Sequence, residues 1–389
     1  MPLKHYLLTP GPTPVPERIA LAMAQPIPHH RAPAFEALFA EVREGLKWLY
    51  GTKEDVLTFA SSGTGAMEGA IVNFQRAGDE ILTVNGGKFG ERWGKIGKAY
   101  GLKVHELKVE WGKAVEPAAI EQALKEHPGI RGVYLQASES STGVAHPVRE
   151  VAALTRGSQA ICVVDAVSAL GAMPLPMDEW GIDVLITGSQ KALMLPPGLA
   201  FAAASEKAWK LSAEATLPRF YFDWRREREM QRKNQTAWTP AISLVVGLAE
   251  VIRWLREEGL DRVYARHERL AKASRAAMEA IGCRLYAERP VVSLTTVWSP
   301  EGVDSDKLVK TLKTKYGVTL VGGQDAAKGK IFRIAHLGYF DDLDIVIAVA
   351  AIERALADHG YRAQPLGTGV GAAMRVMQEL AEKPAEKAA

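Results

Sequence analysis

The fold that this sequence predicts is decided by one stretch, Gly181-Ile-Asp-Val-Leu-Ile-Thr-Gly-Ser-Gln-Lys191-Ala-Leu-Met-Leu-Pro-Pro-Gly198. An apolar run from Val184 to Thr187 has the length of a buried strand, and it stops at Gly188. The segment Pro196-Pro197-Gly198 then breaks regular structure. Lys191 therefore lies just past a strand end, where an open α/β sheet binds its ligands. Desolvation at such a position lowers the pKa of a lysine and makes its amine a nucleophile.

A second strand end supplies a carboxylate. The apolar run Ala160-Ile-Cys-Val-Val-Asp165 ends in Asp165, upstream of Lys191. Lys191 alone would be interpreted as one of many surface lysines, but a pyridoxal phosphate site requires this pair. The lysine binds the aldehyde of the cofactor, and the acid keeps the ring nitrogen protonated so that the ring withdraws electrons. We therefore predict pyridoxal 5'-phosphate as the cofactor, with Lys191 and Asp165 as the catalytic residues.

Four motifs extend this pattern: Ser62-Gly-Thr-Gly-Ala-Met-Glu68, Glu139-Ser-Ser-Thr-Gly143, Asp165-Ala-Val-Ser168 and Gly188-Ser-Gln-Lys191. Together they resemble the class V family of fold-type I pyridoxal-phosphate aminotransferases, most closely its alanine:glyoxylate and serine:pyruvate branch. The resemblance covers most of the chain. It implies an α/β fold, with a mostly parallel, doubly wound sheet in a large domain and a smaller α+β C-terminal domain.

The length of 389 residues exceeds that of a usual single domain. We expect an N-terminal arm at 1–34, a large cofactor-binding domain at 35–258, a small domain at 259–364 and a tail at 365–389. Prolines in the arm favour an extended chain over helices, and the arm is expected to lie across a partner subunit and the site entrance. The segment 223–233 alternates positive and negative charges, which predicts a solvated segment.

A glycine-rich turn after the strand expected at 56–60 is predicted to bind the cofactor phosphate, because its free amides and the helix dipole suit an anion. Turn-forming glycines without a ligand are the competing interpretation. Glu68 stands where a dinucleotide site has its third glycine, which disfavours a nicotinamide dehydrogenase. With the residues that the resemblance implies, the predicted cofactor-binding set is Ser62, Gly63, Thr64, Gly65, Phe89, Ser140, Asp165, Val167, Gln190, Lys191, Thr236 and Thr239.

Within this set the resemblance implies particular roles. Phe89 would stack on the pyridine ring. Ser140 would lie near the ring hydroxyl, although a Ser/Thr-rich cap before the next helix is the alternative. Thr239, with Thr236 beside it, would reach the phosphate bound by the neighbouring subunit. The site is therefore expected to be shared within a homodimer.

Arg333 lies between Phe332 and Ile334 on an expected strand. A buried arginine should meet a carboxylate, either in a structural ion pair or, as the resemblance implies, in the substrate's α-carboxylate. The resemblance also implies that the arm approaches the substrate, which makes Gly11 the second predicted substrate contact. His30 and Arg31 either contact substrate or simply dock the arm, and the sequence assigns no role to His29.

We expect a transaminase that moves an amino group from alanine or serine to glyoxylate or pyruvate. Only Arg333 has motif support as a carboxylate clamp, and aspartate or phosphoserine aminotransferases are the alternative. A non-catalytic subunit of a redox complex on the same fold is a further alternative, which the intact catalytic residues disfavour. A cysteine desulfurase is also disfavoured, because Gln190 stands where that family has a histidine and neither Cys162 nor Cys283 suits its nucleophile.

Composition limits the partners, cellular location and metal sites that the sequence predicts. The net charge of +3 is small and dispersed, so nucleic acid is not an expected partner. A signal peptide and apolar runs of membrane length are lacking, so we expect a cytoplasmic protein without membrane contacts. Two cysteines suggest a reducing compartment and are too few for a cysteine-ligated iron–sulfur cluster. No metal site is predicted.

Overall fold

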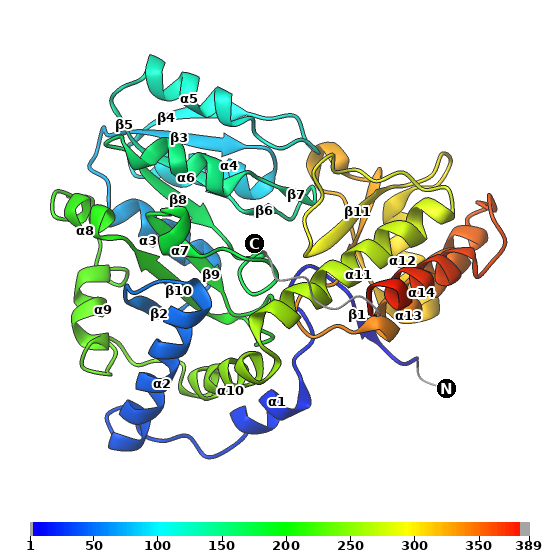
Figure 1. Ribbon diagram of the computed structural model, residues 1–389, viewed down its shortest axis with the longest axis horizontal. Helices are drawn as coiled ribbons and strands as arrows, with labels where there is room; N and C mark the ends of the chain where they lie inside the picture. The colour runs from blue at the N-terminus through cyan, green and yellow to red at the C-terminus, as the bar shows by residue number, and fades with distance from the viewer. Residues whose placement is uncertain (1–2, 382–389) are drawn as a thin grey trace.

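The computed structural model describes residues 3–381. Its centre is a seven-stranded sheet in the order β2-β10-β9-β8-β5-β3-β4 (Figure 1). β10 runs antiparallel to both of its neighbours, and the remaining pairs are parallel, which confirms the mostly parallel sheet. The strands are β2 Val56–Ser61, β3 Glu80–Asn85, β4 Lys103–Lys108, β5 Ile130–Gln136, β8 Ile161–Asp165, β9 Val184–Gly188 and β10 Gly198–Ala204.

Helices cover both faces of this sheet because its side chains alternate between two cores. On β8, Cys162 and Val164 face one core, whereas Ile161 and Val163 face the other. The first core includes α2 Pro33–Tyr50, α5 Pro117–Glu126, α6 Val148–Arg156, α7 Met177–Trp180 and α10 Ile242–Glu258. The second includes α3 Gly63–Val72, α4 Lys88–Ala99, α8 Glu206–Ser212 and α9 Trp224–Gln231. The sheet is thus doubly wound.

A smaller unit with its own hydrophobic core lies beside the large sheet (Figure 1). Its antiparallel sheet has the order β11-β14-β13, formed by Leu294–Trp298, Ile331–Ala335 and Val321–Gly322. Its helices are α11 Leu260–Ala280, α12 Ser305–Tyr316, α13 Asp342–Asp358 and α14 Thr368–Ala381, with the 3-10 turn η1 Asp325–Ala327. We propose the division predicted above, with boundaries at 34, 258 and 364; residues 382–389 of the tail lie outside the described residues. No helix among the described residues is long and apolar enough to span a membrane.

The N-terminal arm contains regular structure, which differs from the extended arm predicted from its prolines. β1 Tyr6–Leu7 pairs in parallel with β12 Val318–Thr319 of the smaller unit. Helix α1, Glu17–Met23, packs against α10 and buries Ile19 in the core of the large unit. The prolines did not prevent a helix because none lies inside it: Pro16 is its N-cap, where a missing N–H costs no helical hydrogen bond, and Pro26 follows its end. The arm therefore joins both units of the same chain.

The charged segment 223–233 differs in part from its prediction: residues 225, 226, 229, 232 and 233 are exposed, but most of the segment forms helix α9 with one buried face. Trp224, Glu227 and Gln231 of this helix are buried. The side chain of Gln231 hydrogen-bonds both the N–H and the C=O of Thr58 on β2, at 3.1 and 2.8 Å. Alternating charges misled the prediction because a single sequence does not show which charges find partners on another element.

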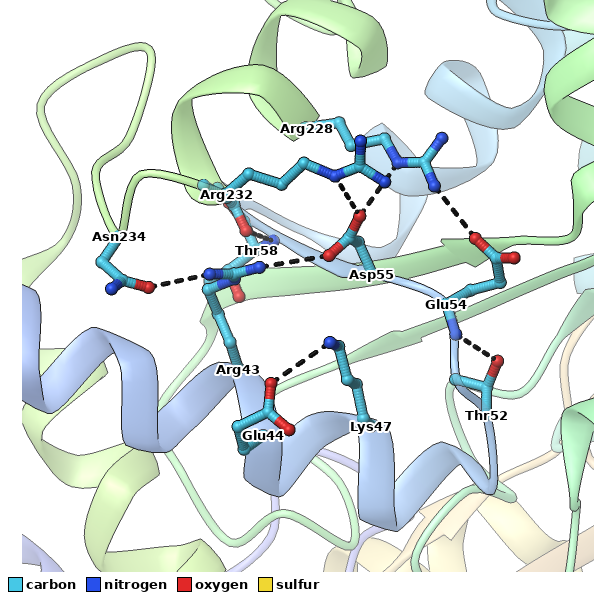
Figure 2. Close-up of polar contacts among 11 residues, drawn as sticks. Arg43, Glu44, Lys47, Thr52, Glu54, Asp55, Thr58, Arg228, Arg232 and Asn234 are labelled. Atoms are coloured by element: carbon cyan, nitrogen blue, oxygen red, sulfur yellow. Dashed lines mark hydrogen bonds and ion pairs between the residues drawn. The ribbon is translucent and has the colours of Figure 1, made fainter.

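Asp55 holds α9 and α2 at the start of β2. It accepts hydrogen bonds from Arg228 of α9, from Arg232 at the C-cap of α9 and from Arg43 of α2, at 3.0, 2.8 and 3.1 Å (Figure 2). The Asp55 side chain is only 9% exposed. One buried carboxylate thus links three arginine side chains from two parts of the chain, and Glu54 accepts a further hydrogen bond from Arg228 at 3.0 Å.

Replacing Asp55 with asparagine should destabilise the protein. Burial opposes ionisation of Asp55, but hydrogen bonds from Arg228 and Arg232 outweigh it and lower the pKa. A folded-state pKa below the unfolded value stabilises the protein above the unfolded pKa, and this stabilisation is lost as pH falls through the folded-state pKa. We expect Asp55→Asn to lower the free energy of unfolding by about 1–3 kcal/mol at pH 7, measured by urea denaturation.

Asp261→Asn is the matched control, because Asp261 is exposed in the first turn of α11. It should change stability by at most about 0.5 kcal/mol. The difference between Asp55→Asn and wild type should also shrink as the pH is lowered toward the folded-state pKa of Asp55. Equal losses from the two substitutions at pH 7 would contradict the role assigned to Asp55.

Candidate active site

Two adjacent parallel strands bring Lys191 and Asp165 to one edge of the large sheet. Asp165 is the last residue of β8, and Lys191 follows the end of β9. Asp165 is 5% exposed and Lys191 is 8% exposed. Lys191 Nζ donates a hydrogen bond to the carbonyl oxygen of Pro10, and Asp165 Oδ1 accepts one from the Val167 amide at 2.8 Å. The structure therefore places both residues at strand ends, in buried positions.

Burial shifts both groups toward neutrality. Desolvation lowers the pKa of Lys191 to about 8, although the nearby Asp165 carboxylate opposes the shift. Desolvation also raises the pKa of Asp165 to about 6, while the Val167 amide opposes that shift. Lys191 therefore has a substantial neutral fraction at mildly alkaline pH, as a nucleophile or base requires. Asp165 is ionised above pH 6 and can face a cationic group.

The glycine-rich turn forms the beginning of α3. The helix includes residues 63–65, which were expected in the turn, and Ser62 is its N-cap. Within the described chain no side chain caps this end, so its first amide groups are available to an anion. A Cβ atom on Gly63 would lie 2.7 Å from Val167 Cγ2, and the Thr64 hydroxyl accepts a hydrogen bond from Arg92 at 2.9 Å. The turn thus adjoins the strand end that carries Asp165.

Arg333 reaches the same site from β14 of the smaller unit. Its Nε and Nη2 donate to the Gly322 carbonyl oxygen at 3.1 and 2.8 Å, and its Nη1 donates to that of Ser140 at 2.8 Å. The expected structural ion pair is not among the ion pairs of residues 3–381, so that interpretation is corrected. Burial lowers the pKa of Arg333 to about 10, while the charge of Glu139 opposes the shift. The carbonyl groups orient the guanidinium without neutralising it, which leaves it suited to a carboxylate ligand.

Glu139 is a buried carboxylate to which the sequence analysis gave no role. Its oxygens accept hydrogen bonds from the amides of residues 89–90 at the start of α4 and from the amide and hydroxyl of Ser141. Burial raises its pKa, and its charge acts on both Asp165 and Arg333. The signal was present, because Glu139 directly precedes Ser140 in a motif quoted above. Its hydrogen bonds at a helix N-terminus became visible only in the structure.

Other predicted residues surround this centre. Phe89 lies in the first turn of α4, and the guanidinium of Arg92 is 4.8 Å from the centre of its ring. Gln190 Oε1 is buried, and no described residue provides it with a hydrogen bond. A Cβ atom on Gly11 would lie 2.4 Å from Lys191 Nζ, so only a glycine allows the arm to pass this close to the lysine. Arg92 was missed by sequence reasoning, although it follows Phe89 by one helical turn.

Within this chain, Thr236 and Thr239 contact residues other than Lys191 and Asp165. The Thr236 hydroxyl donates to the Trp238 carbonyl oxygen at 2.6 Å, and Thr239 lines a small cavity with Tyr221. Arg31 of the arm donates to the Thr236 carbonyl oxygen at 3.2 Å. The predicted contact of both threonines with a neighbour's phosphate stays a prediction, and Arg31 shares their location. His29 and His30 form a tilted ring pair 4.7 Å apart beside Arg31, with no functional partner identified in the described chain.

Comparisons with known proteins agree with this geometry. The family model for class-V aminotransferases matches residues 5–338. A soluble hydrogenase small subunit from Synechococcus sp. (strain PCC 6716) is 42% identical, over 96% of this chain and 98% of its own. A serine–glyoxylate aminotransferase from Methylorubrum extorquens is 36% identical over 97% of each chain. An L-aspartate–glyoxylate aminotransferase from Paracoccus denitrificans is 36% identical over 100% of each chain. The crystal structure of ureidoglycine–glyoxylate aminotransferase from Bacillus subtilis has a TM-score of 0.91 at 28% identity, covering 97% of this chain and 99% of that one.

The residues present fit pyridoxal phosphate, the cofactor that this similarity implies. Lys191 offers an amine of lowered pKa, and Asp165 offers a buried carboxylate with one hydrogen-bonded oxygen. The glycine turn at 63–65 leaves an uncapped helix N-terminus for a phosphate. The unpartnered oxygen of Gln190 is a further polar group with no other use in the described chain. These are the features of an incomplete polar site rather than of a finished core.

The pKa of Asp165 leads to a stability prediction for the cofactor-free protein. A folded-state pKa near 6 lies above the unfolded value of about 3.9. The contribution to stability is therefore fully present below pH 4 and is lost as pH rises through 6. Asp165→Asn should make the cofactor-free protein more stable than wild type at pH 8, by on the order of 1–3 kcal/mol, and should make no such difference at pH 4. Thermal unfolding of cofactor-free protein across this pH range measures the effect.

Asp183→Asn is the contrasting control on the same sheet. Asp183 is also buried, but it accepts hydrogen bonds from the Cys162 amide and the Ser205 hydroxyl and lies 3.5 Å from Lys207 Nζ. Its replacement should destabilise the protein at pH 8 because those donors lose a charged acceptor. If Asp165→Asn destabilised the cofactor-free protein as Asp183→Asn does, the assignment of Asp165 as a desolvated functional acid would be wrong.

Proposed function

The chain belongs to the class-V aminotransferase family, and from that membership we propose that it transfers the amino group of alanine or serine to glyoxylate or pyruvate. It is a transaminase that uses pyridoxal phosphate. The observation that carries the choice of substrate is Arg333, a buried guanidinium that only carbonyl groups orient. It provides a single carboxylate clamp, which suits donors whose side chain is small and uncharged.

Different residues of the site have different roles in this reaction. The cofactor, when bound, supplies an electron sink for the pair left when the substrate Cα–H bond breaks. Lys191 Nζ takes up the Cα proton, because its lowered pKa leaves part of it unprotonated. Asp165 would face the protonated ring nitrogen, and residues 62–65 with Gln190 would hold the phosphate. Arg333 binds the substrate α-carboxylate and thereby orients the Cα–H bond, which contributes to the rate by positioning.

Two other arginines near the predicted site residues, Arg92 and Arg31, have partners of their own within the described chain. Arg92 donates to the Thr64 hydroxyl and stacks on Phe89. Arg31 donates to the Gln235 side chain at 2.7 Å and to a neighbouring carbonyl oxygen. A donor with a distal carboxylate would therefore leave that charge unpaired inside the site. The similarity to a serine–glyoxylate aminotransferase supports a small polar donor.

Aspartate is the second candidate donor, because an L-aspartate–glyoxylate aminotransferase is equally similar. It would require a second arginine in the site, and we propose Arg31 for this role, with the arginines between residues 225 and 232 as the alternative. Arg31 donates a hydrogen bond to the Thr236 carbonyl oxygen at 3.2 Å, and we propose that the segment containing Thr236 crosses to the partner's site. The donor screen below distinguishes the two candidates.

We also propose a homodimer with shared active sites in the cytoplasm. Phe220 and Tyr221 are 71% and 40% exposed and pack against Trp238, so an apolar aromatic patch lies beside Thr239. Exposed patches of this kind are commonly covered by another subunit. Two free, buried cysteines support a reducing compartment.

A screen of donors against acceptors tests the proposed substrate. We expect kcat/KM for alanine or serine to exceed that for aspartate or phosphoserine by at least about 10-fold, because burying an unpaired carboxylate costs more than 1.4 kcal/mol. Glyoxylate, pyruvate and 2-oxoglutarate are compared as acceptors. A higher kcat/KM for aspartate would refute the single-clamp argument, and loss of that aspartate activity in Arg31→Ala would then identify Arg31 as the missing clamp.

Lys191→Ala should abolish transamination, with a loss of kcat of at least about 10³-fold. Borohydride treatment of wild type should leave the cofactor on the peptide that contains Lys191, as shown by mass spectrometry. Lys210→Ala, an exposed residue of α8, is the control and should retain full activity. Cofactor on a different lysine would refute the assignment. A wild type that binds the cofactor but transaminates none of the donors would favour the non-catalytic role suggested by similarity to a hydrogenase subunit.

A further inference from the structure

A carboxylate and two imidazoles meet at the other end of the large sheet. Glu80 is the first residue of β3, His105 lies on the neighbouring edge strand β4, and His127 is the C-cap of α5. One ligand atom from each lies within 4.8 Å of the other two. Lys191 and Asp165 lie at the carboxyl ends of their strands, whereas Glu80 begins its strand. The cluster is therefore separate from the transaminase site.

The geometry of this cluster brings the donors together before any ligand binds. His105 Nε2 lies 2.7 Å from Glu80 Oε2, and the rings of His105 and His127 stack with centroids 4.0 Å apart. Lys103 Nζ donates to the other carboxylate oxygen, Glu80 Oε1, at 2.8 Å and so orients the carboxylate. A Cβ atom on Gly129 would lie 3.5 Å from the Glu80 carboxylate carbon, so the turn after α5 lies directly against it. Three separate elements thus converge on one point.

We propose that Glu80, His105 and His127 form a binding site for Zn²⁺ or a similar divalent transition-metal ion. Two imidazole nitrogens and one carboxylate oxygen are a donor set that zinc accepts, with a fourth position left for water. Ligand atoms around a tetrahedral zinc lie roughly 3.3 Å apart. His105 Nε2 and Glu80 Oε2 are already 2.7 Å apart. The His127 ligand atom lies within 4.8 Å of the others, and the position of His127 at a helix end allows it to approach an ion held by that pair. The side chains of Glu80 and His105 are 26% and 16% exposed, so an ion has access from solvent.

The chemistry favours a transition metal over calcium or magnesium. Those ions prefer six or more oxygen ligands, and this cluster offers one carboxylate. A bound ion would tie the edge strand β4 and the C-terminus of α5 to β3. Its effect would be a stabilisation of this edge that depends on metal concentration.

Isothermal titration of the tag-free holoenzyme with Zn²⁺ after chelation tests this site. We expect one Zn²⁺ per chain in wild type, with a rise in Tm at saturating metal. The double variant His105→Gln/His127→Gln should weaken binding by at least about 10-fold and remove the metal-dependent rise in Tm. Glu80→Gln, which keeps the shape of the side chain, should weaken binding as well, and it serves if the double variant fails to fold.

A second pair of histidines whose rings lie close together, His29 and His30, provides a matched control. His29 and His30 have ring centroids 4.7 Å apart but lack a carboxylate in the same cluster. The double variant His29→Gln/His30→Gln should therefore bind zinc as wild type does. Absence of stoichiometric zinc binding in wild type would overturn the proposal, and so would equal weakening, or equal retention, of binding in the two double variants.

Discussion

The burial of a lysine and a carboxylate at the ends of adjacent parallel strands is the constraint on which the candidate site depends. Each group loses its hydrogen bonds with water on burial. The protein replaces only some of them, with one carbonyl oxygen for Lys191 and one amide for Asp165. Stronger pairing would leave both groups fully charged and inert. The weak pairing instead keeps the pKa of Lys191 near 8 and that of Asp165 near 6. The two cores that enclose the sheet must support this unfavourable arrangement.

Glu139 extends the same electrostatics to the substrate side. It lies in a short hairpin formed by β6 Ser138–Glu139 and β7 Val144–Ala145. Its carboxylate accepts hydrogen bonds from the amides of residues 89–90 in the first turn of α4. The carbonyl oxygen of the next residue, Ser140, accepts a hydrogen bond from Arg333. The hairpin therefore fixes Phe89 through an acid at a helix N-terminus and orients Arg333 through a carbonyl group. The negative charge of Glu139 also favours the charged form of Arg333 and disfavours the charged form of Asp165.

Features that depend on neighbouring residues in the sequence were predicted well, and those that depend on distant partners were not. Strand ends are local, so Lys191 and Asp165 were found from apolar runs and the glycine that follows. The pairing of β1 with β12 joins residues more than three hundred positions apart, which no local pattern reports. Helix α9 was misread for the same reason, because Asp55, its partner, belongs to another part of the chain. The roles proposed for Thr236 and Thr239 involve a second subunit, so contacts within one chain do not report them.

The arrangement of the arm explains why the substrate should bind between the two units. Beyond β1, which pairs with β12 of the smaller unit, Gly11 passes beside Lys191 and the Thr13 hydroxyl donates to the Lys191 carbonyl oxygen. Arg333 approaches from β14 of that same smaller unit. The predicted substrate contacts thus come from the smaller unit and the arm, whereas Lys191 and Asp165 belong to the large sheet. A substrate held by Arg333 must therefore present its reacting carbon across the boundary to Lys191, which is where binding sites at domain interfaces commonly form.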